Sequence, residues 1–143
     1  KGYDFTGFIF VFEFFQNGSI ETYLTSYLKS NGTQNEKINP TIRSKIIYGV
    51  ASIMQKLHEK SIIHRNLTTS SILLDEKFEP KIAGFKNAKL FVNDMENTMT
   101  FDIHPNYLAP EAYMDEDETY GLSVDVYSYS FCLYRMFSNI TYQ

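Results

Sequence analysis

The first stretch of the chain has large apolar residues at every second position. Within residues 5–15, one face of this pattern carries Phe8, Phe10, Phe12 and Phe14, and the opposite face is also mostly apolar. Period-two spacing is typical of a β-strand, and apolar residues on both faces indicate cover on both sides. We therefore expect a buried strand here, ended by the turn signal Gln16-Asn17-Gly18.

Two helices are predicted from their start signals and periodicity. Ser19 is suited to cap a helix over 20–28, with Glu21 in its first turn. Asn39-Pro40 combines a capping residue with proline at the first helical position, which signals a second helix. From there to Glu59, apolar residues recur at three- and four-residue steps: Ile42, Ile46, Ile47, Val50, Ile53, Met54 and Leu57. This predicts a long amphipathic helix.

A hairpin and a strongly apolar helix complete the predicted elements. Two short apolar runs, 71–75 and 80–83, flank the turn-like residues 76–79, which predicts a small β-hairpin. Residues 124–137 are apolar around nearly the whole helical circumference. Such a helix is expected to lie inside a core.

Composition and charge narrow the class of protein. The 143 residues are 43% hydrophobic and 21% charged, which is typical of one globular domain or part of one. The net charge of −4 argues against a nucleic-acid partner, because phosphate binding needs a surplus of Lys and Arg on one face. Cys132 is the only cysteine, so no intrachain disulfide is expected and a reducing compartment is favoured.

Membrane and metal signals are weak in this sequence. No uncharged apolar segment approaches the roughly 18–20 residues that cross a bilayer, and no leader-like segment opens the chain. An intracellular, cytoplasmic location is therefore expected. The three histidines and the cysteine lack the close paired spacing of a zinc site: His58, His64, His104 and Cys132.

A polar loop between two apolar runs carries the most specific chemistry. It opens with His64-Arg65-Asn66-Leu67 and leaves through Ser71-Ile72-Leu73-Leu74. This segment resembles the catalytic loop of protein kinases, whose signature is H-R-D-L-x-x-x-N. In that register, Asn66 stands where the catalytic aspartate belongs, and Ser71 stands where the magnesium-binding asparagine belongs. The frame of the loop, including His64 and Arg65, is retained, whereas its reactive groups are not.

A second magnesium position is altered in the same way. After the predicted hairpin, protein kinases carry Asp-Phe-Gly, whose aspartate holds magnesium. The corresponding residues here are Gly84, Phe85 and Lys86. The resemblance assigns Phe85 to packing, whereas Gly84 offers no carboxylate and Lys86 brings a cation near the metal position. Magnesium is therefore not expected to bind.

The first strand and the turn after it resemble the hinge of a protein kinase, where adenine docks against strand backbone. On that resemblance Phe12 is the gatekeeper, and Glu13 and Phe15 supply the hinge carbonyl and amide for a nucleotide. A bulky gatekeeper narrows such a pocket. The alternative is a buried strand with no ligand.

Residues 87–104 correspond to the activation loop of the family. Thr98 and Thr100 could accept phosphate there, but solvated loop residues are the simpler interpretation because the local charge is negative. Ala109-Pro110-Glu111 matches the end of that loop. His104 stands where serine/threonine kinases usually carry threonine, which weakens any inference about the substrate hydroxyl.

Two further positions receive structural roles from the resemblance. Glu111 would pair with an arginine of the later large lobe. Asp125-Val126-Tyr127-Ser128 resembles the buried helix of tyrosine-kinase-like and tyrosine kinases, in which Asp125 would hold the backbone of the His64-Arg65 pair. As a bare sequence feature, Asp125 could equally cap a helix.

The motifs occur in family order and cover almost the whole chain. The resemblance therefore implies an α+β, protein-kinase-like fold, mostly the helical large lobe with a hinge strand and a small hairpin. Residues 1–143 would form a partial kinase domain, with the last small-lobe strand and hinge in 1–18 and an incomplete large lobe in 19–143. Most of the small lobe is expected to be missing. We therefore expect part of a longer chain or a truncated gene product.

Three hypotheses follow for function. The first is a pseudokinase that acts by protein binding or scaffolding in signalling, because Asn66, Ser71 and Gly84 leave out the proton acceptor and both magnesium ligands. The second is an active serine/threonine or tyrosine kinase whose missing groups come from elsewhere, such as Asp75 or Asp102. The third is a structural fragment without ligand. ATP is allowed as the ligand of an intact two-lobed chain, and no other cofactor is indicated.

Overall fold

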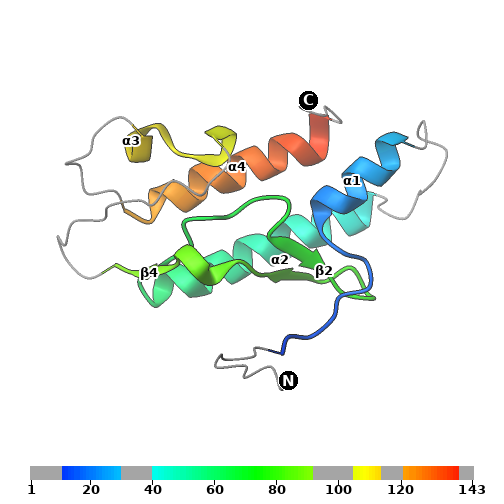
Figure 1. Cartoon of the computed structure of the whole chain (residues 1–143), viewed down its shortest axis with the longest axis horizontal. Coiled ribbons are helices and arrows are strands. Elements are labelled where there is room, and N and C mark those ends of the chain that lie inside the picture. The colour runs from blue at the N-terminus through cyan, green and yellow to red at the C-terminus, as the bar shows by residue number, and fades with distance from the viewer. Residues whose placement is uncertain (1–10, 30–39, 92–104, 114–120, 139–143) are drawn as a thin grey trace, which may run out of the picture.

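Two long helices form the frame of the structure. The computed structural model describes residues 11–29, 40–91, 105–113 and 121–138. Helix α2 (Pro40–Glu59) and helix α4 (Ser123–Ser138) extend across the molecule, with two small sheets and the shorter helices around them (Figure 1). Buried side chains of both helices belong to one core cluster, among them Ile46, Val50, Met54, Cys132 and Met136.

Helix α1 (Ile20–Lys29) confirms the helix that was predicted over 20–28. Ser19 Oγ accepts the backbone N–H of Thr22 at 3.1 Å, which satisfies one of the free donors at the helix start. The residue before this cap is bound to strand β2 (Ile72–Leu74), because the Gly18 carbonyl accepts the N–H of Leu74 at 2.9 Å. The start of α1 is therefore fixed against the hairpin.

Helix α2 confirms the second helix prediction at both ends. It begins at Pro40 and ends at Glu59. Proline suits the first helical position because its missing N–H would have no intrahelical partner there. The buried part of the apolar stripe consists of Ile46, Val50 and Met54.

Gly49 lets α2 approach the hairpin closely. A Cβ at this position would lie 2.5 Å from Cγ and 2.8 Å from Cδ of Pro80, the first residue of β3 (Pro80–Ile82). We predict that Gly49→Ala lowers the free energy of unfolding by about 1–2 kcal/mol, although alanine is the better helix former. Chemical denaturation measures the change, with Ser52→Ala on an exposed face of α2 as the control. Equal stability of wild type and Gly49→Ala would contradict the close approach.

Two short antiparallel sheets surround the loop that begins at His64. Strand β2 pairs with β3, which confirms the predicted hairpin. Strand β1 (Ile62–Ile63) pairs with β4 (Lys89–Leu90). The sequence did not predict this second pairing, because two-residue strands show no periodicity. It fixes the chain before His64 against the chain that follows the short helix η1 (Phe85–Asn87).

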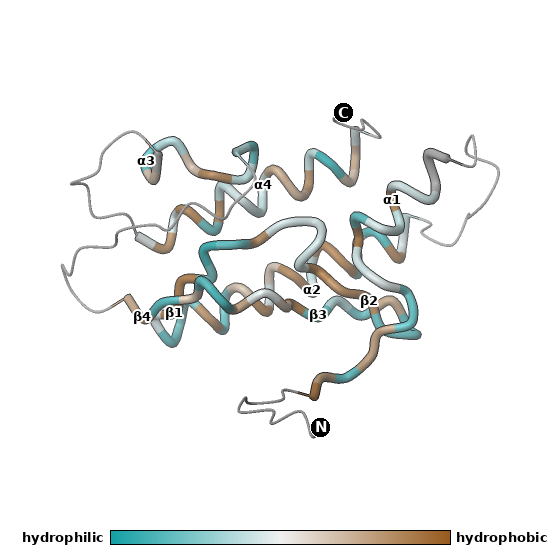
Figure 2. The backbone as a smooth tube through the Cα atoms, viewed as in Figure 1, coloured by the Kyte–Doolittle hydropathy of each residue, from teal (hydrophilic) through white to brown (hydrophobic). Residues whose placement is uncertain are grey.

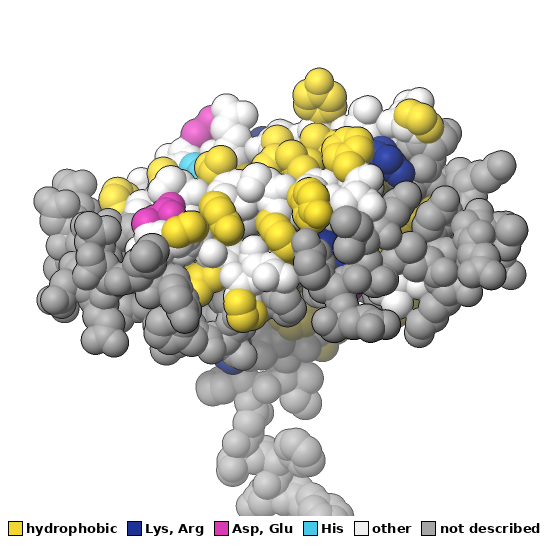
Figure 3. Space-filling model, turned by 90° about the horizontal axis from the view of Figure 1, so that it is seen from above, with side chains coloured by type: hydrophobic (Ala, Val, Ile, Leu, Met, Phe, Trp, Pro, Cys, Tyr) yellow, Lys and Arg dark blue, Asp and Glu magenta, His cyan; other side chains and the backbone are white. Residues whose placement is uncertain are grey.

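In the described part of the structure, helix α4 is buried on one side. A smaller core cluster joins its first turn to β1 and to helix α3 (Pro110–Tyr113): Ile63, Leu108, Ala109, Ala112 and Val124. On the outer side, Val126 is 60% and Phe137 58% exposed. Hydrophobic and hydrophilic residues alternate along α4 in Figure 2, and hydrophobic side chains gather on the upper face in Figure 3. The expectation that this helix lies inside a core is therefore confirmed for one face and wrong for the other within the described residues.

The predicted first strand is not formed in its described part. Residues 11–15 have no regular secondary structure, and Val11, Phe12 and Phe14 are 91%, 83% and 85% exposed. A strand is stabilised by ladder hydrogen bonds and by packing of its faces. Among the described residues no strand pairs with 11–15, and Val11, Phe12 and Phe14 are exposed, so the predicted burial is also wrong for these three side chains. Residues 5–10 of the predicted strand lie outside the described residues.

Candidate functional site

A buried carboxylate holds the loop that opens with His64. Asp125 on α4 is 1% exposed, and its two oxygens accept the backbone N–H groups of His64 at 2.8 Å and of Arg65 at 2.9 Å. His58 Nε2, near the end of α2, lies 2.9 Å from the same carboxylate. Arg65 has a left-handed φ of 60°, which costs energy in a residue other than glycine. The hydrogen bonds to Asp125 therefore stabilise the left-handed conformation of Arg65, which is unfavourable on its own.

His64 is fully buried at the centre of this loop. Its Nε2 donates to the Ala83 carbonyl at 3.0 Å, and its Nδ1 accepts the backbone N–H of Asn66 at 3.3 Å. One donating and one accepting nitrogen make a neutral ring. Burial lowers the pKa of His64, against opposing effects of the Ala83 carbonyl and of Asp125.

The pKa of His64 gives the stability of the protein a definite dependence on pH. Because the folded-state pKa lies below the ordinary value of 6.5, the unfolded chain binds this proton more readily. We predict that stability is fully present above pH 6.5 and falls as the pH drops through 6.5 toward the folded pKa, by up to about 1.4 kcal/mol per pH unit. When thermal melting is measured across this pH range, the melting temperature of His64→Gln should fall less steeply with decreasing pH than that of wild type. A wild-type protein that gains stability in acid would contradict the prediction.

The three substituted positions of the kinase-like motifs come together in the structure. Gly84 has a left-handed φ of 83°, and a Cβ built there would lie 3.5 Å from Cβ of Ser71 and 3.8 Å from Nδ2 of Asn66. These distances are ordinary van der Waals contacts. Positions 66, 71 and 84 therefore form one small cluster, although the first and the last are 18 positions apart in the sequence.

The Ser71 hydroxyl is engaged by its own loop. Its Oγ accepts the backbone N–H of Thr68 at 2.9 Å and lies 3.0 Å from the Thr68 carbonyl, to which it donates. In return, the Ser71 N–H bonds the carbonyl of Thr68 at 3.1 Å and its hydroxyl at 3.2 Å. The turn from 68 to 71 is thereby closed on itself.

This cluster does not fit a magnesium ion. Magnesium prefers carboxylate and other oxygen ligands in octahedral geometry. Gly84 has no side chain, the Ser71 hydroxyl is engaged with Thr68, and Asn66 turns its amide nitrogen toward Gly84. Across the described ranges, no group of three His, Cys, Asp or Glu side chains is arranged to hold a metal ion.

Three other predicted site residues make contacts outside this cluster. Arg65 Nε donates to the Asn87 carbonyl at 2.5 Å, and the Phe85 ring packs edge-on against the His64 ring at 4.8 Å between centroids. Glu111 accepts a weak bond from the Ser123 hydroxyl at 3.4 Å.

The predicted hinge residues lie in the segment before α1. Phe12 and Glu13 are exposed, and the Phe15 carbonyl accepts the Gly18 N–H at 3.1 Å, closing the turn that precedes α1. The activation-loop residues Thr98 and Thr100 lie outside the described residues, as do Asp102 and His104.

A second polar cluster joins distant segments, and the sequence did not predict it. Arg135 on α4 is 7% exposed and donates from Nη2 to Oε1 of Glu21 on α1 at 2.6 Å. The Thr69 hydroxyl donates to Oε2 of Glu21 at 2.5 Å and lies 2.7 Å from the Tyr107 hydroxyl. Burial raises the pKa of Tyr107. The sequence did contain one signal of this cluster, namely Arg135 within the apolar run 124–137. A charged residue in a buried helix needs a partner of opposite charge.

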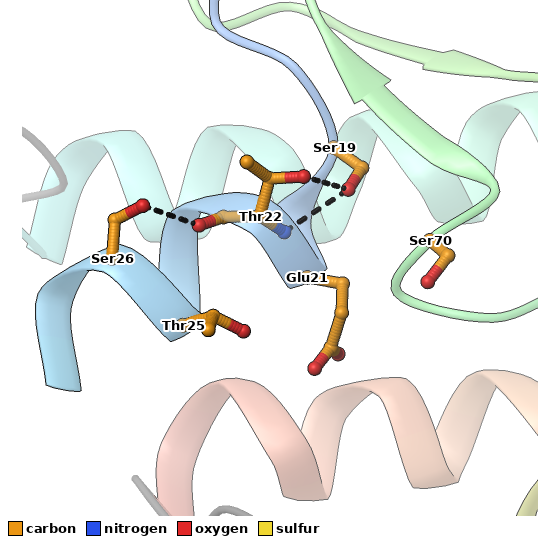
Figure 4. Close-up of a pocket in the computed structure, with 6 residues that line it drawn as sticks. All are labelled: Ser19, Glu21, Thr22, Thr25, Ser26 and Ser70. Carbon is orange, nitrogen blue, oxygen red and sulfur yellow. Dashed lines mark hydrogen bonds between the residues drawn. The ribbon is translucent and has the colours of Figure 1, made fainter. Parts of the chain in front are cut away.

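Two cavities share Glu21 in their lining. Hydroxyl-bearing residues line the first, of about 340 Å³, together with Glu21: Ser19, Thr22, Thr25, Ser26 and Ser70. Figure 4 shows Glu21 extending from α1 toward α4, between Thr25 and Ser70. The second cavity, of about 270 Å³, is lined by Arg135, Tyr107 and residues 68–70 among others. The surface beside the 68–71 turn is therefore hollowed, with hydroxyl-bearing and charged side chains among the lining residues.

Comparison with known proteins identifies the family. The model of the protein kinase domain matches residues 3–142. The chain belongs to the protein kinase domain family. Its mostly helical structure with small antiparallel sheets is that of the kinase large lobe, which confirms the predicted α+β, kinase-like fold.

Relatives of this kinase domain occur in plants and in a social amoeba. The chain is 38% identical over 126 residues to cysteine-rich receptor-like protein kinase 6 of Oryza sativa subsp. japonica, a match that covers 85% of the chain. It is 36% identical over 133 residues to cysteine-rich receptor-like protein kinase 38 of Arabidopsis thaliana, covering 90%. A probable serine/threonine-protein kinase of Dictyostelium discoideum is 33% identical over 135 residues, covering 94%.

The chain spans only a small part of each of these relatives. The matched regions make up 17%, 19% and 10% of the rice, Arabidopsis and Dictyostelium proteins, respectively. In the part of this kinase domain that the structure describes, no helix has the length and apolar character needed to cross a membrane.

Proposed function

We propose that this kinase domain is a pseudokinase that acts in signalling by binding other proteins. The observation that carries the proposal is the convergence of Asn66, Ser71 and Gly84 in one cluster without a carboxylate. Around it the scaffold is kept, since Asp125 still holds the backbone of His64 and Arg65. A folded loop that lacks the proton acceptor and the magnesium ligands is better suited to binding a protein than to transferring phosphate.

The chemistry of phosphate transfer supports this proposal. An asparagine amide cannot accept a proton from a substrate hydroxyl, and the loss of a positioned base typically lowers a rate by about 10²–10⁴-fold. Phosphoryl transfer also depends on electrostatic stabilisation by metal ions. With Ser71 and Gly84 at the magnesium-ligand positions, that stabilisation is also expected to be missing. Activity is therefore expected to be reduced by the changes at the proton-transfer position and at the metal positions.

The second candidate is an active serine/threonine or tyrosine kinase, and the names of the similar proteins favour it because they are protein kinases. A replacement base would then have to come from another carboxylate. Asp75 is a poor candidate, because its Oδ1 accepts the backbone N–H groups of Lys77 and Glu79 at 2.9 and 2.8 Å, and its Oδ2 lies 3.6 Å from Lys81 Nζ. Backbone bonds, first of all that of Glu79, lower the pKa of Asp75. Asp102 would be the remaining candidate.

The proposed layout follows the family. Residues 1–18 would carry the last small-lobe strand and hinge, and 19–143 would form the first part of the large lobe. A nucleotide such as ATP would contact Phe12, Glu13 and Phe15 in an intact two-lobed chain. We further propose that the domain works inside the cell, where protein partners in signalling are available to it.

A phosphoryl-transfer assay with the complete gene product tests the proposal. We expect no transfer from labelled ATP with magnesium, either to itself or to a general protein substrate. The triple variant Asn66→Asp, Ser71→Asn, Gly84→Asp is the positive comparison, since it restores the family residues at all three positions. Transfer by the wild type would overturn the proposal, and loss of that transfer in Asp102→Asn would favour the second candidate. A third reading, a fragment without ligand, predicts no thermal shift with ATP.

A further inference from the structure

We draw no further inference here: the strongest candidate, the exposed apolar side of α4 (Figure 3) together with the groove of about 560 Å³ that it forms with α2, carries none, because nothing in the described part of the structure shows what covers it.

Discussion

Asp125→Ala is expected to lower the free energy of unfolding by about 3–5 kcal/mol. The substitution removes the acceptor of two backbone N–H groups, those of His64 and Arg65, at a position that is 1% exposed. It also leaves His58 without its carboxylate partner and releases Arg65 from the bonds that hold its φ of 60°. Asp125→Asn keeps one oxygen acceptor and should lose about half as much.

Hydrogen exchange and melting together measure this effect. The amides of His64 and Arg65 should exchange faster in Asp125→Ala than in wild type, and the melting temperature should fall. Val126→Ala is the matched control, since the next residue on α4 is 60% exposed and such substitutions usually change stability by less than about 0.5 kcal/mol. Unchanged exchange at His64 and Arg65 in Asp125→Ala would contradict the hold that we assign to this carboxylate.

Glu21→Ala is expected to cost about 2–4 kcal/mol, because it leaves the Arg135 charge buried without a counter-charge. Arg135 is 7% exposed and donates to Glu21 at 2.6 Å, and Thr69 loses its acceptor in the same variant. The Glu21 side chain is 32% exposed, so solvent reduces the cost below that of a fully buried pair.

A double-mutant cycle separates the pair from its surroundings. Glu21→Ala and Arg135→Met together should be less destabilising than the sum of the two single changes, by more than about 1 kcal/mol. The matched control is the Lys45–Glu79 pair, at 2.8 Å but with both side chains more than a third exposed. Its coupling should be at most about 1 kcal/mol. Equal coupling in the two pairs would show that burial of Arg135 does not matter.

Local signals were enough to predict the regular elements of this chain. The Ser19 cap and the Asn39-Pro40 start placed both α1 and α2, because helix termini depend on a few neighbouring side chains. The hairpin β2–β3 followed from two apolar runs around a short turn. Motif order was likewise enough to identify the kinase family, since separate motifs with family spacing rarely occur together by chance.

Contacts between distant segments could not be predicted in this way. The pairing of β1 with β4 rests on two residues in each strand, too few for any periodic pattern. Glu21 was assigned to the start of its own helix, whereas its partner Arg135 lies 114 residues away. The burial expected for Val11, Phe12 and Phe14 failed for the same reason, because periodicity describes the strand itself and not the neighbours that would cover it.

The substituted site was predictable in its composition and not in its geometry. The motifs place Asn66, Ser71 and Gly84 in register, but only the structure shows that one Cβ on Gly84 would contact both of the others. The engagement of the Ser71 hydroxyl by Thr68 was equally invisible in sequence, because it depends on how the loop closes.

The closed turn between Thr68 and Ser71 affects how much conformational entropy this loop would lose when a partner protein binds. Four hydrogen bonds between these two residues already restrict the backbone before anything binds. Ordering a loop on association costs free energy that reduces affinity. A partner protein that docks over this turn would meet a surface whose conformational freedom has been lost during folding, so the association itself would lose little.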